Sequence, residues 1–126
     1  MYTILRVGAV VGKGSVFWDW LISELGSKKK VDLFDDIFSP TPLNTIFQAL
    51  HTCINLKLKG IFHVSGGKSI SRYEFGCLLN RKLLKTDVSI VKINRNTDYQ
   101  INRALTCSKE FNELYTLDDF INESII

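Results

Sequence analysis

Residues 60–75 read GIFHVSGGKSISRYEF, and this stretch decides how the rest of the chain is interpreted. Its first half predicts a strand that leaves through a glycine turn at Ser65–Gly67. In its second half, Ser71 and Glu74 have the spacing of a capping box, which predicts a helix through residue 84. A turn after a parallel strand is where α/β proteins bind ligands, but a plain strand-to-helix connection has the same sequence.

A more apolar strand is predicted at the beginning of the chain. Residues 3–11 are apolar on both faces, which is typical of a parallel strand covered by helices on each side. The turn Gly12-Lys13-Gly14 ends it, and a helix is expected over residues 15–25. A short strand is expected over Val31–Phe34. Without neighbours, the first strand would expose an apolar edge that invites aggregation.

The segment Ser39-Pro40-Thr41-Pro42 predicts extended and exposed backbone, because a residue before proline avoids helical angles. Two interpretations remain open for it. It is either a loop of the substrate site, or a rigid linker whose hydroxyls cap the next helix. That helix is the clearest amphipathic one in the sequence, with apolar residues at helical spacing: Leu43, Ile46, Phe47, Leu50 and Ile54.

The last third of the chain alternates short elements. A half-buried strand is expected over residues 88–93, an irregular polar stretch over 94–104, and two short helices near 107–114 and 117–124. Thr116 is the expected cap of the final helix. Strands and helices thus alternate along the chain, which predicts the α/β class and a single domain over residues 1–126.

Composition excludes several classes of protein. The 126 residues carry a net charge of +3, which is too weak to indicate a nucleic-acid partner. The run Lys28-Lys29-Lys30 is interpreted as a solvated turn, with an anion-binding patch as the alternative. Three widely spaced cysteines indicate neither a zinc site nor a disulfide framework. There is no leader pattern and no run of about 18 apolar residues, so we expect a cytoplasmic protein without a membrane partner.

The sequence lacks the motifs of catalysis. A dinucleotide-binding turn needs the pattern G-x-G-x-x-G. Gly12 and Gly14 match its first two glycines, but Phe17 stands where the third glycine is required. Short-chain reductases use a tyrosine and a lysine four residues apart, and no tyrosine in this chain has that partner. Zinc-protease, Walker and nucleophile-elbow motifs are also absent. We therefore expect no catalytic residue and no metal site.

Three single residues leave alternatives open. His63 lies in mid-strand among apolar residues, which favours a hydrogen-bonded core histidine over a catalytic one. Trp18 and Trp20 flank an aspartate on the first helix. We expect one of them in the core and the other on a partner surface, with stacking on a sugar as the alternative.

Four segments resemble, in the same order, the second half of the dTDP-4-dehydrorhamnose reductase family of extended short-chain dehydrogenase/reductases. Ile4–Gly12 is similar to the family's Leu-Arg strand leading to a glycine, and Asp35–Thr41 to its Asp-Gln-x-Gly-Ser-Pro-Thr segment. The closest match is Gly60–Gly66 with Ser71–Phe75, which resembles Gly-x-Tyr-His-x-Ser-Gly followed by Ser-x-Tyr-Glu-Phe-Ala. Leu105–Lys109 resembles a Leu-Ser-x-x-Lys segment.

The resemblance implies the C-terminal portion of such an enzyme: a partial Rossmann-type parallel sheet with a small substrate-binding subdomain. The ligand would be a nucleotide sugar. NADPH or NADH would serve the intact enzyme, and this chain alone would hold no cofactor. Ala9 and Val16 depart from the family, which has a sugar-holding tryptophan and an asparagine at these places. The candidate substrate-binding residues are Ser39, Thr41, Arg95, Tyr99, Asn102 and Arg103, the last four as contacts of a diphosphate.

Three hypotheses about function follow. The first is the sugar-nucleotide-binding part of a reductase, inactive alone, which pairs with a missing N-terminal dinucleotide-binding half or with another protein. The second is a non-catalytic interaction subunit, since the regulatory beta subunit of methionine adenosyltransferase has a similar Gly-x-Phe-His-x-Ser-Gly and Tyr-Glu pattern. The third is a decayed enzyme without a ligand.

Overall fold

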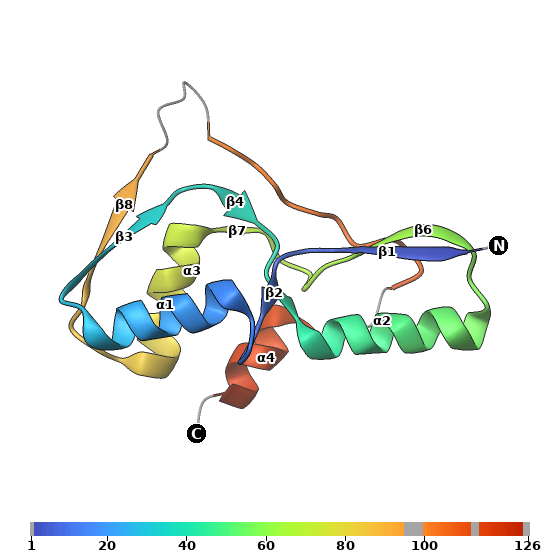
Figure 1. The fold of residues 1–126 in the computed structure, drawn as a ribbon, viewed down its shortest axis with the longest axis horizontal. Helices are drawn as coiled ribbons and strands as arrows, with labels where there is room; N and C mark the ends of the chain where they lie inside the picture. The colour runs from blue at the N-terminus through green and yellow to red at the C-terminus, as the bar shows by residue number, and fades with distance from the viewer. Residues whose placement is uncertain (1, 95–99, 112–113, 125–126) are drawn as a thin grey trace.

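The computed structural model describes residues 2–94, 100–111 and 114–124. Its fold is α/β, as predicted, and Figure 1 shows two lobes that join in the middle of the molecule. In chain order the elements are β1 (Thr3–Val7), β2 (Val10–Val11), α1 (Val16–Ser27), β3 (Lys30–Phe34), β4 (Ile37–Phe38), β5 (Thr41–Pro42), α2 (Leu43–Leu56), β6 (Gly60–Val64), β7 (Ile70–Ser71), α3 (Arg72–Leu79), the π-helical turn η1 (Asn80–Leu84), β8 (Ser89–Ile93) and α4 (Leu117–Ser124).

One lobe, the β1 lobe, consists of β1, β6 and the crossover helix α2 (Figure 1). The two strands are parallel, with Val7 opposite Val64. The buried residues of α2 are the small side chains Thr45, Ala49 and Cys53, which recur every fourth residue on one side of the helix. Small side chains let the helix axis approach the strands closely, so this side of α2 faces the core.

The apolar stripe predicted for the same helix lies outside the core. The helix itself is confirmed, but Leu43, Phe47, Leu50 and Ile54 are all exposed. Because the small-residue side of α2 covers β6, the apolar side faces away from the strand pair. The β1 lobe therefore presents a row of large apolar side chains to its surroundings.

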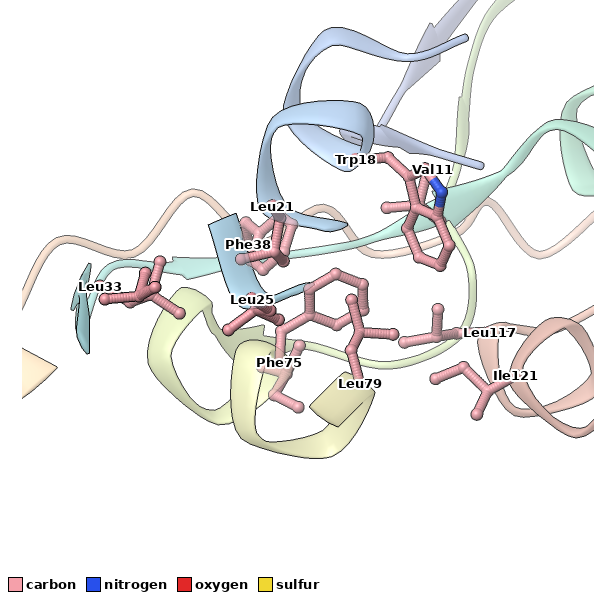
Figure 2. Close-up of a cluster of buried hydrophobic side chains, with 12 residues drawn as sticks. Val11, Trp18, Leu21, Leu25, Leu33, Phe38, Phe75, Leu79, Leu117 and Ile121 are labelled. Atoms are coloured by element: carbon pink, nitrogen blue, oxygen red, sulfur yellow. The ribbon is translucent and has the colours of Figure 1, made fainter. Parts of the chain in front are cut away.

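The other lobe, the β3 lobe, packs α1 and α3 against the parallel pair β3 and β8. Its centre is Phe75, which is fully buried and contacts the rings of Phe17, Trp18 and Phe38. Trp18 is the core tryptophan and Trp20 the exposed one, which confirms that they face different sides. Figure 2 shows Phe75 among residues of β2, β3, α1, α3 and α4: Val11, Leu21, Leu25, Leu33, Leu79, Leu117 and Ile121.

Two short pairings join the lobes: β2 with β5 in parallel, and β4 with β7 antiparallel. The segment between β4 and α2 passes between two glycines. A Cβ atom on Gly8 would lie 2.3 Å from the carbonyl oxygen of Ser39, and one on Gly66 would lie 2.2 Å from that of Pro40. Any side chain would prevent these approaches, so both glycines serve close packing of backbone on backbone.

Two expectations about extended segments are corrected. The single strand expected over residues 3–11 is two strands, because the chain bends at Gly8 and Ala9 to admit the segment after β4. Residues 39–42 are extended, as predicted, but they are buried rather than exposed, since both lobes close over them. Their hydroxyls do not cap the next helix: Pro42 is the N-cap residue of α2, without a side-chain bond.

The helix expected near residues 107–114 is wrong for the described part of that stretch. Residues 107–111 and 114 are not helical. Instead, the backbone of Ser108 donates to the carbonyl oxygen of His63 at 2.8 Å, and the Ser108 hydroxyl accepts from the His63 amide at 2.7 Å. Pairing with β6 satisfies the backbone groups that a helix would have satisfied internally.

The predicted helix caps are confirmed. Ser71 Oγ accepts from the Glu74 amide at 3.0 Å at the start of α3. At the start of α4, Thr116 Oγ1 accepts from the Asp119 amide at 3.1 Å, and the Asp119 carboxylate accepts from the Thr116 amide at 3.0 Å. Within the described ranges, none of the helices is long and apolar enough to traverse a bilayer.

Candidate functional site

One hollow of the described chain opens where β2 ends. It has a volume of about 790 Å³ and lies between the turn at residues 12–14, the first turn of α1, the start of α2 and Phe120 of α4. We call it the glycine-turn cavity. β2 and β5 are parallel, so the cavity lies beyond the carboxyl ends of parallel strands, where open α/β sheets bind ligands.

Positive φ angles shape the rim of the glycine-turn cavity. Gly12 and Gly14 have φ of 122° and 97°, conformations that side chains rarely adopt, and they turn the chain from β2 into α1. The Ser15 hydroxyl donates to the Val10 carbonyl at 2.7 Å and accepts from an amide in the first turn of α1. The walls are mostly apolar, with Lys13, Ser15 and Asn44 as polar side chains. Such a lining suits a ligand held by a few polar contacts.

A second hollow of about 340 Å³ lies on the other side of the first turn of α1. We call it the aromatic cavity. Its lining comprises Phe17, Trp20, Asp32, Leu33, Phe34 and Arg72. The Arg72 guanidinium carbon lies 4.5 Å from the centre of the Phe17 ring and 4.6 Å from that of Phe38. These cation–π contacts hold the guanidinium at the floor of the cavity.

Phe17 lines both cavities, so the first turn of α1 lies between the two chambers. The Phe17 and Trp20 rings are stacked with centroids 6.2 Å apart, and Trp20 is 44% exposed. The aromatic cavity therefore offers a flat apolar surface beside a cation and a carboxylate. The glycine-turn cavity offers apolar walls with few polar groups.

Two of the residues predicted as substrate contacts are buried and bonded within the protein. Ser39 Oγ accepts from the Leu105 amide at 2.8 Å and lies 3.3 Å from the Leu105 carbonyl oxygen, to which it donates. Thr41 Oγ1 donates to the Ser39 carbonyl at 3.0 Å. These hydroxyls fix the segment that joins the two lobes, and neither residue lines the two cavities.

The remaining candidates lie on the segment after β8. Asn102 and Arg103 are exposed, and the Arg103 amide donates to the Ile37 carbonyl at 2.8 Å. The Asn102 side chain accepts from the Ala104 amide at 2.9 Å. Neither residue lines the glycine-turn or the aromatic cavity. Arg95 and Tyr99 lie outside the described residues.

One signal in the sequence indicates the glycine-turn cavity. The turn Gly12-Lys13-Gly14 follows an apolar strand and opens a helix, which is the position of ligand-binding turns in α/β proteins. The aromatic cavity had no such signal, because β3, α1 and α3 contribute Asp32, Trp20 and Arg72 from separate parts of the chain.

The described part of the chain has three free thiols and no cluster of metal-ligating side chains. No group of three or more histidine, cysteine, aspartate or glutamate residues there is arranged to hold a metal ion. The three cysteines are free thiols, and burial raises the pKa of the Cys53 thiol, which keeps it protonated.

The sequence matches no protein-family model and no curated protein. Solved structures share its fold. The dTDP-4-dehydrorhamnose reductase from Bacillus anthracis, in complex with NADP, has a TM-score of 0.81 at 18% identity, covering 97% of this chain and 46% of that chain. The reductase from Clostridium acetobutylicum has a TM-score of 0.81 at 17% identity, covering 96% of this chain and 47% of that chain.

A related enzyme of different chemistry is also similar. The UDP-N-acetylglucosamine 4-epimerase from Methanobrevibacter ruminantium, in complex with UDP-N-acetylmuramic acid, has a TM-score of 0.76 at 14% identity, covering 98% of this chain and 43% of that chain. The chain spans a little less than half the length of the solved structures it matches. Over that span, it has the fold of the dTDP-4-dehydrorhamnose reductases and related extended short-chain dehydrogenase/reductases.

Proposed function

We propose that this chain is the nucleotide-sugar-binding part of a dTDP-4-dehydrorhamnose reductase-like protein and is inactive by itself. The observation that carries the proposal is the pair of cavities that share Phe17, of which the glycine-turn cavity lies at the carboxyl ends of the parallel strands β2 and β5. A nucleotide sugar has one flat aromatic end, one polyhydroxyl end and a charged diphosphate between them. The aromatic cavity has a flat aromatic surface and a cation for a base and a phosphate, and the glycine-turn cavity has Ser15 and Asn44 for hydroxyl groups beside its apolar walls.

In this proposal the base lies in the aromatic cavity. The exposed face of Trp20 stacks on the base, and the Asp32 carboxylate accepts a hydrogen bond from a ring N–H. The Arg72 guanidinium, already held over Phe17, supplies positive charge for a phosphate. The sugar then lies in the glycine-turn cavity, near Ser15 and Asn44. Ser39 and Thr41 act indirectly, because their hydroxyls fix the segment that joins the two lobes.

The glycine turn does not fit the pyrophosphate of NAD or NADP. The Gly14 amide already donates to both carboxylate oxygens of Asp19, at 3.2 Å each. Ser15 Oγ accepts a hydrogen bond from the Trp18 amide at 3.3 Å. The Gly14 and Trp18 amides at the start of α1 are therefore occupied, and Asp19 places a negative charge where a pyrophosphate would need positive partners.

Calorimetry with dTDP-rhamnose tests the proposal. We expect heat of binding with dTDP-rhamnose and with dTDP, and none with NADPH. Trp20→Ala should weaken the affinity about tenfold or more, because stacking on a base contributes roughly 1–3 kcal/mol. Ser23→Ala, an exposed substitution on the same helix, is the matched control and should bind like the wild type. Equal binding by wild type and Trp20→Ala would show that the base lies elsewhere.

A non-catalytic interaction subunit is the second candidate, favoured by the exposed apolar side of α2. It predicts no heat with any dTDP-sugar, together with a stable protein complex. The same titration therefore separates the two candidates.

A further inference from the structure

One end of the β3 lobe collects positive charge. The turn at residues 28–30, between α1 and β3, and the turn at residues 85–88, between η1 and β8, both lie at the left of Figure 1, away from the β1 lobe. Two hydrogen bonds join them: the Thr86 hydroxyl donates to the Leu25 carbonyl at 3.0 Å, and the Ser89 amide donates to the Lys29 carbonyl at 2.8 Å. Cations that are far apart in the sequence therefore share one surface.

This surface, which we call the basic end, holds the positive surplus of the chain. Its cations are all exposed: Lys28, Lys29, Lys30, Arg81, Lys82 and Lys85. Three carboxylates lie among them, since Glu24 bonds to Lys28 at 2.9 Å, Asp32 lies 3.9 Å from Lys30, and Asp87 is exposed in the second turn. The surplus of three positive charges equals the net charge of the whole chain, which is otherwise balanced.

The basic end borders an open strand edge. In the β3–β8 pair the Ser89 amide donates to the Lys29 carbonyl, and the Asp35 amide donates to the Ile93 carbonyl at 3.1 Å. Backbone groups alternate between the two sides of a strand, so residues 89, 91 and 93 face β3. The amides and carbonyls of residues 90 and 92 face the opposite side, where no strand of the described residues pairs with β8. β8 therefore offers hydrogen-bonding groups along an edge that begins at the basic end.

The charge at this edge selects what can occupy it. Lysines beside an exposed edge keep like-charged strands apart, so a second copy of this chain would bring cation against cation. Lys92 adds a further exposed cation on β8 itself, with its Nζ 5.5 Å from the centre of the Tyr73 ring. A strand that carries aspartate or glutamate side chains meets attraction along the same edge.

A polypeptide fits this surface better than a nucleic acid or a membrane does. None of the large exposed apolar side chains of the described residues lies at the basic end, so bases would find no ring to stack on and a bilayer would receive no anchor. The carboxylates of Glu24 and Asp32 would repel a phosphate backbone. Only a polypeptide strand can also pair with the outward backbone groups of Ile90 and Lys92.

We propose that the basic end and the open edge of β8 together bind an extended acidic segment of a polypeptide. The segment adds a strand to β8, its backbone pairs with Ile90 and Lys92, and its carboxylates lie beside Lys85, Lys92 and the turn at residues 28–30. Main-chain pairing fixes the position of the segment, and the cations supply the preference for acidic side chains. None of these residues lines the glycine-turn or the aromatic cavity, so this binding is independent of the nucleotide-sugar site.

Titration of the full chain with two synthetic peptides tests the proposal. Both peptides alternate valine with a charged residue, glutamate in one and lysine in the other, so they share a strand preference and differ in charge. We expect only the glutamate peptide to bind, and to slow hydrogen exchange at the amides of Ile90 and Lys92 about tenfold or more. Raising the salt concentration from about 0.05 M to about 0.5 M should weaken its affinity about tenfold, because the ion pairs are exposed.

Charge variants locate the contact. Lys29→Glu and Lys85→Glu should each weaken binding of the glutamate peptide about three- to tenfold, because an exposed ion pair becomes a like-charge pair. Lys59→Glu makes the same change at an exposed position of the β1 lobe and should bind like the wild type. Lys92→Gln loses the cation, whereas Lys92→Pro also loses the outward amide and should bind more weakly still. Circular dichroism checks that each variant keeps the wild-type fold.

Each other result overturns the proposal. Failure of the glutamate peptide to bind, or equal binding of the lysine peptide, would show that the charge does not select the occupant. Binding without slower exchange at Ile90 and Lys92 would mean that no strand is added to β8. Equal weakening by Lys59→Glu and Lys85→Glu would reduce the effect to the net charge of the chain. Tighter binding of duplex DNA or of phosphatidylglycerol vesicles at the same salt concentration would make the partner a nucleic acid or an anionic membrane.

Discussion

Replacing Gly66 by alanine tests how the two lobes are joined. A Cβ at this position would lie 2.2 Å from the Pro40 carbonyl oxygen, 3.2 Å from Pro42 Cδ and 3.4 Å from Leu117 Cβ. Real Cβ atoms do not approach closer than 3.0 Å, so the Pro40 backbone must move by roughly 0.8 Å. The nearest neighbours are backbone and ring atoms, which cannot move aside as a flexible side chain does.

The expected loss is about 2 kcal/mol in the free energy of unfolding. Overpacking costs about 1–3 kcal/mol, and a clash with rigid backbone lies near the upper end of that range, whereas the restricted unfolded chain of the alanine variant returns about 0.4–1 kcal/mol. For a chain of this size the midpoint of thermal unfolding should fall by about 5–10 °C. Urea and thermal unfolding, followed by circular dichroism, measure both quantities.

Gly26→Ala is the matched control for Gly66→Ala. Gly26 lies in α1, and a Cβ there would meet no atom within 4 Å. Alanine is the better helix former, so this variant should be more stable than the wild type by about 0.5–1 kcal/mol. Should Gly66→Ala unfold at the same midpoint as the wild type or above it, the contact between the lobes is not the one described here.

Three further changes have expected outcomes. Ser71→Ala should lower the free energy of unfolding by about 1 kcal/mol in urea titrations, because the Glu74 amide loses its cap. Phe75→Ala should lower it by about 3–5 kcal/mol and abolish near-ultraviolet ellipticity before far-ultraviolet ellipticity. Burial and the hydrogen bond to Glu123 raise the pKa of Tyr115 to about 12. Its stabilising contribution is complete below about pH 10 and is lost as the pH rises through 12, so wild type should lose more stability over that range than Tyr115→Phe.

Most elements of this chain were predictable because their signals are local. The capping residues Ser71 and Thr116 stand at the starts of α3 and α4, and β3 and β8 lie where short strands were expected. The helix expected near residues 107–114 failed for a non-local reason: the backbone there bonds to His63 in β6. Local spacing carries no information about such a distant partner.

The candidate site was less predictable than the fold. Ser39 and Thr41 were chosen for their resemblance to a family motif, yet their hydroxyls bond within the protein. The aromatic cavity brings Trp20, Asp32 and Arg72 together from three elements that are far apart in sequence. Their proximity follows from the packing of α1 and α3 on β3, which no spacing rule describes.

The sequence by itself determined the α/β class, the order of most helices and strands, and the absence of a dinucleotide fingerprint, since each depends on neighbouring residues. Only the tertiary structure decided which side of α2 is buried. Periodicity identifies an apolar stripe, but the small residues Thr45, Ala49 and Cys53 are the ones that fit against the strands. Burial depends on which surfaces meet in space, and the apolar stripe has no counterpart among the described residues of this chain.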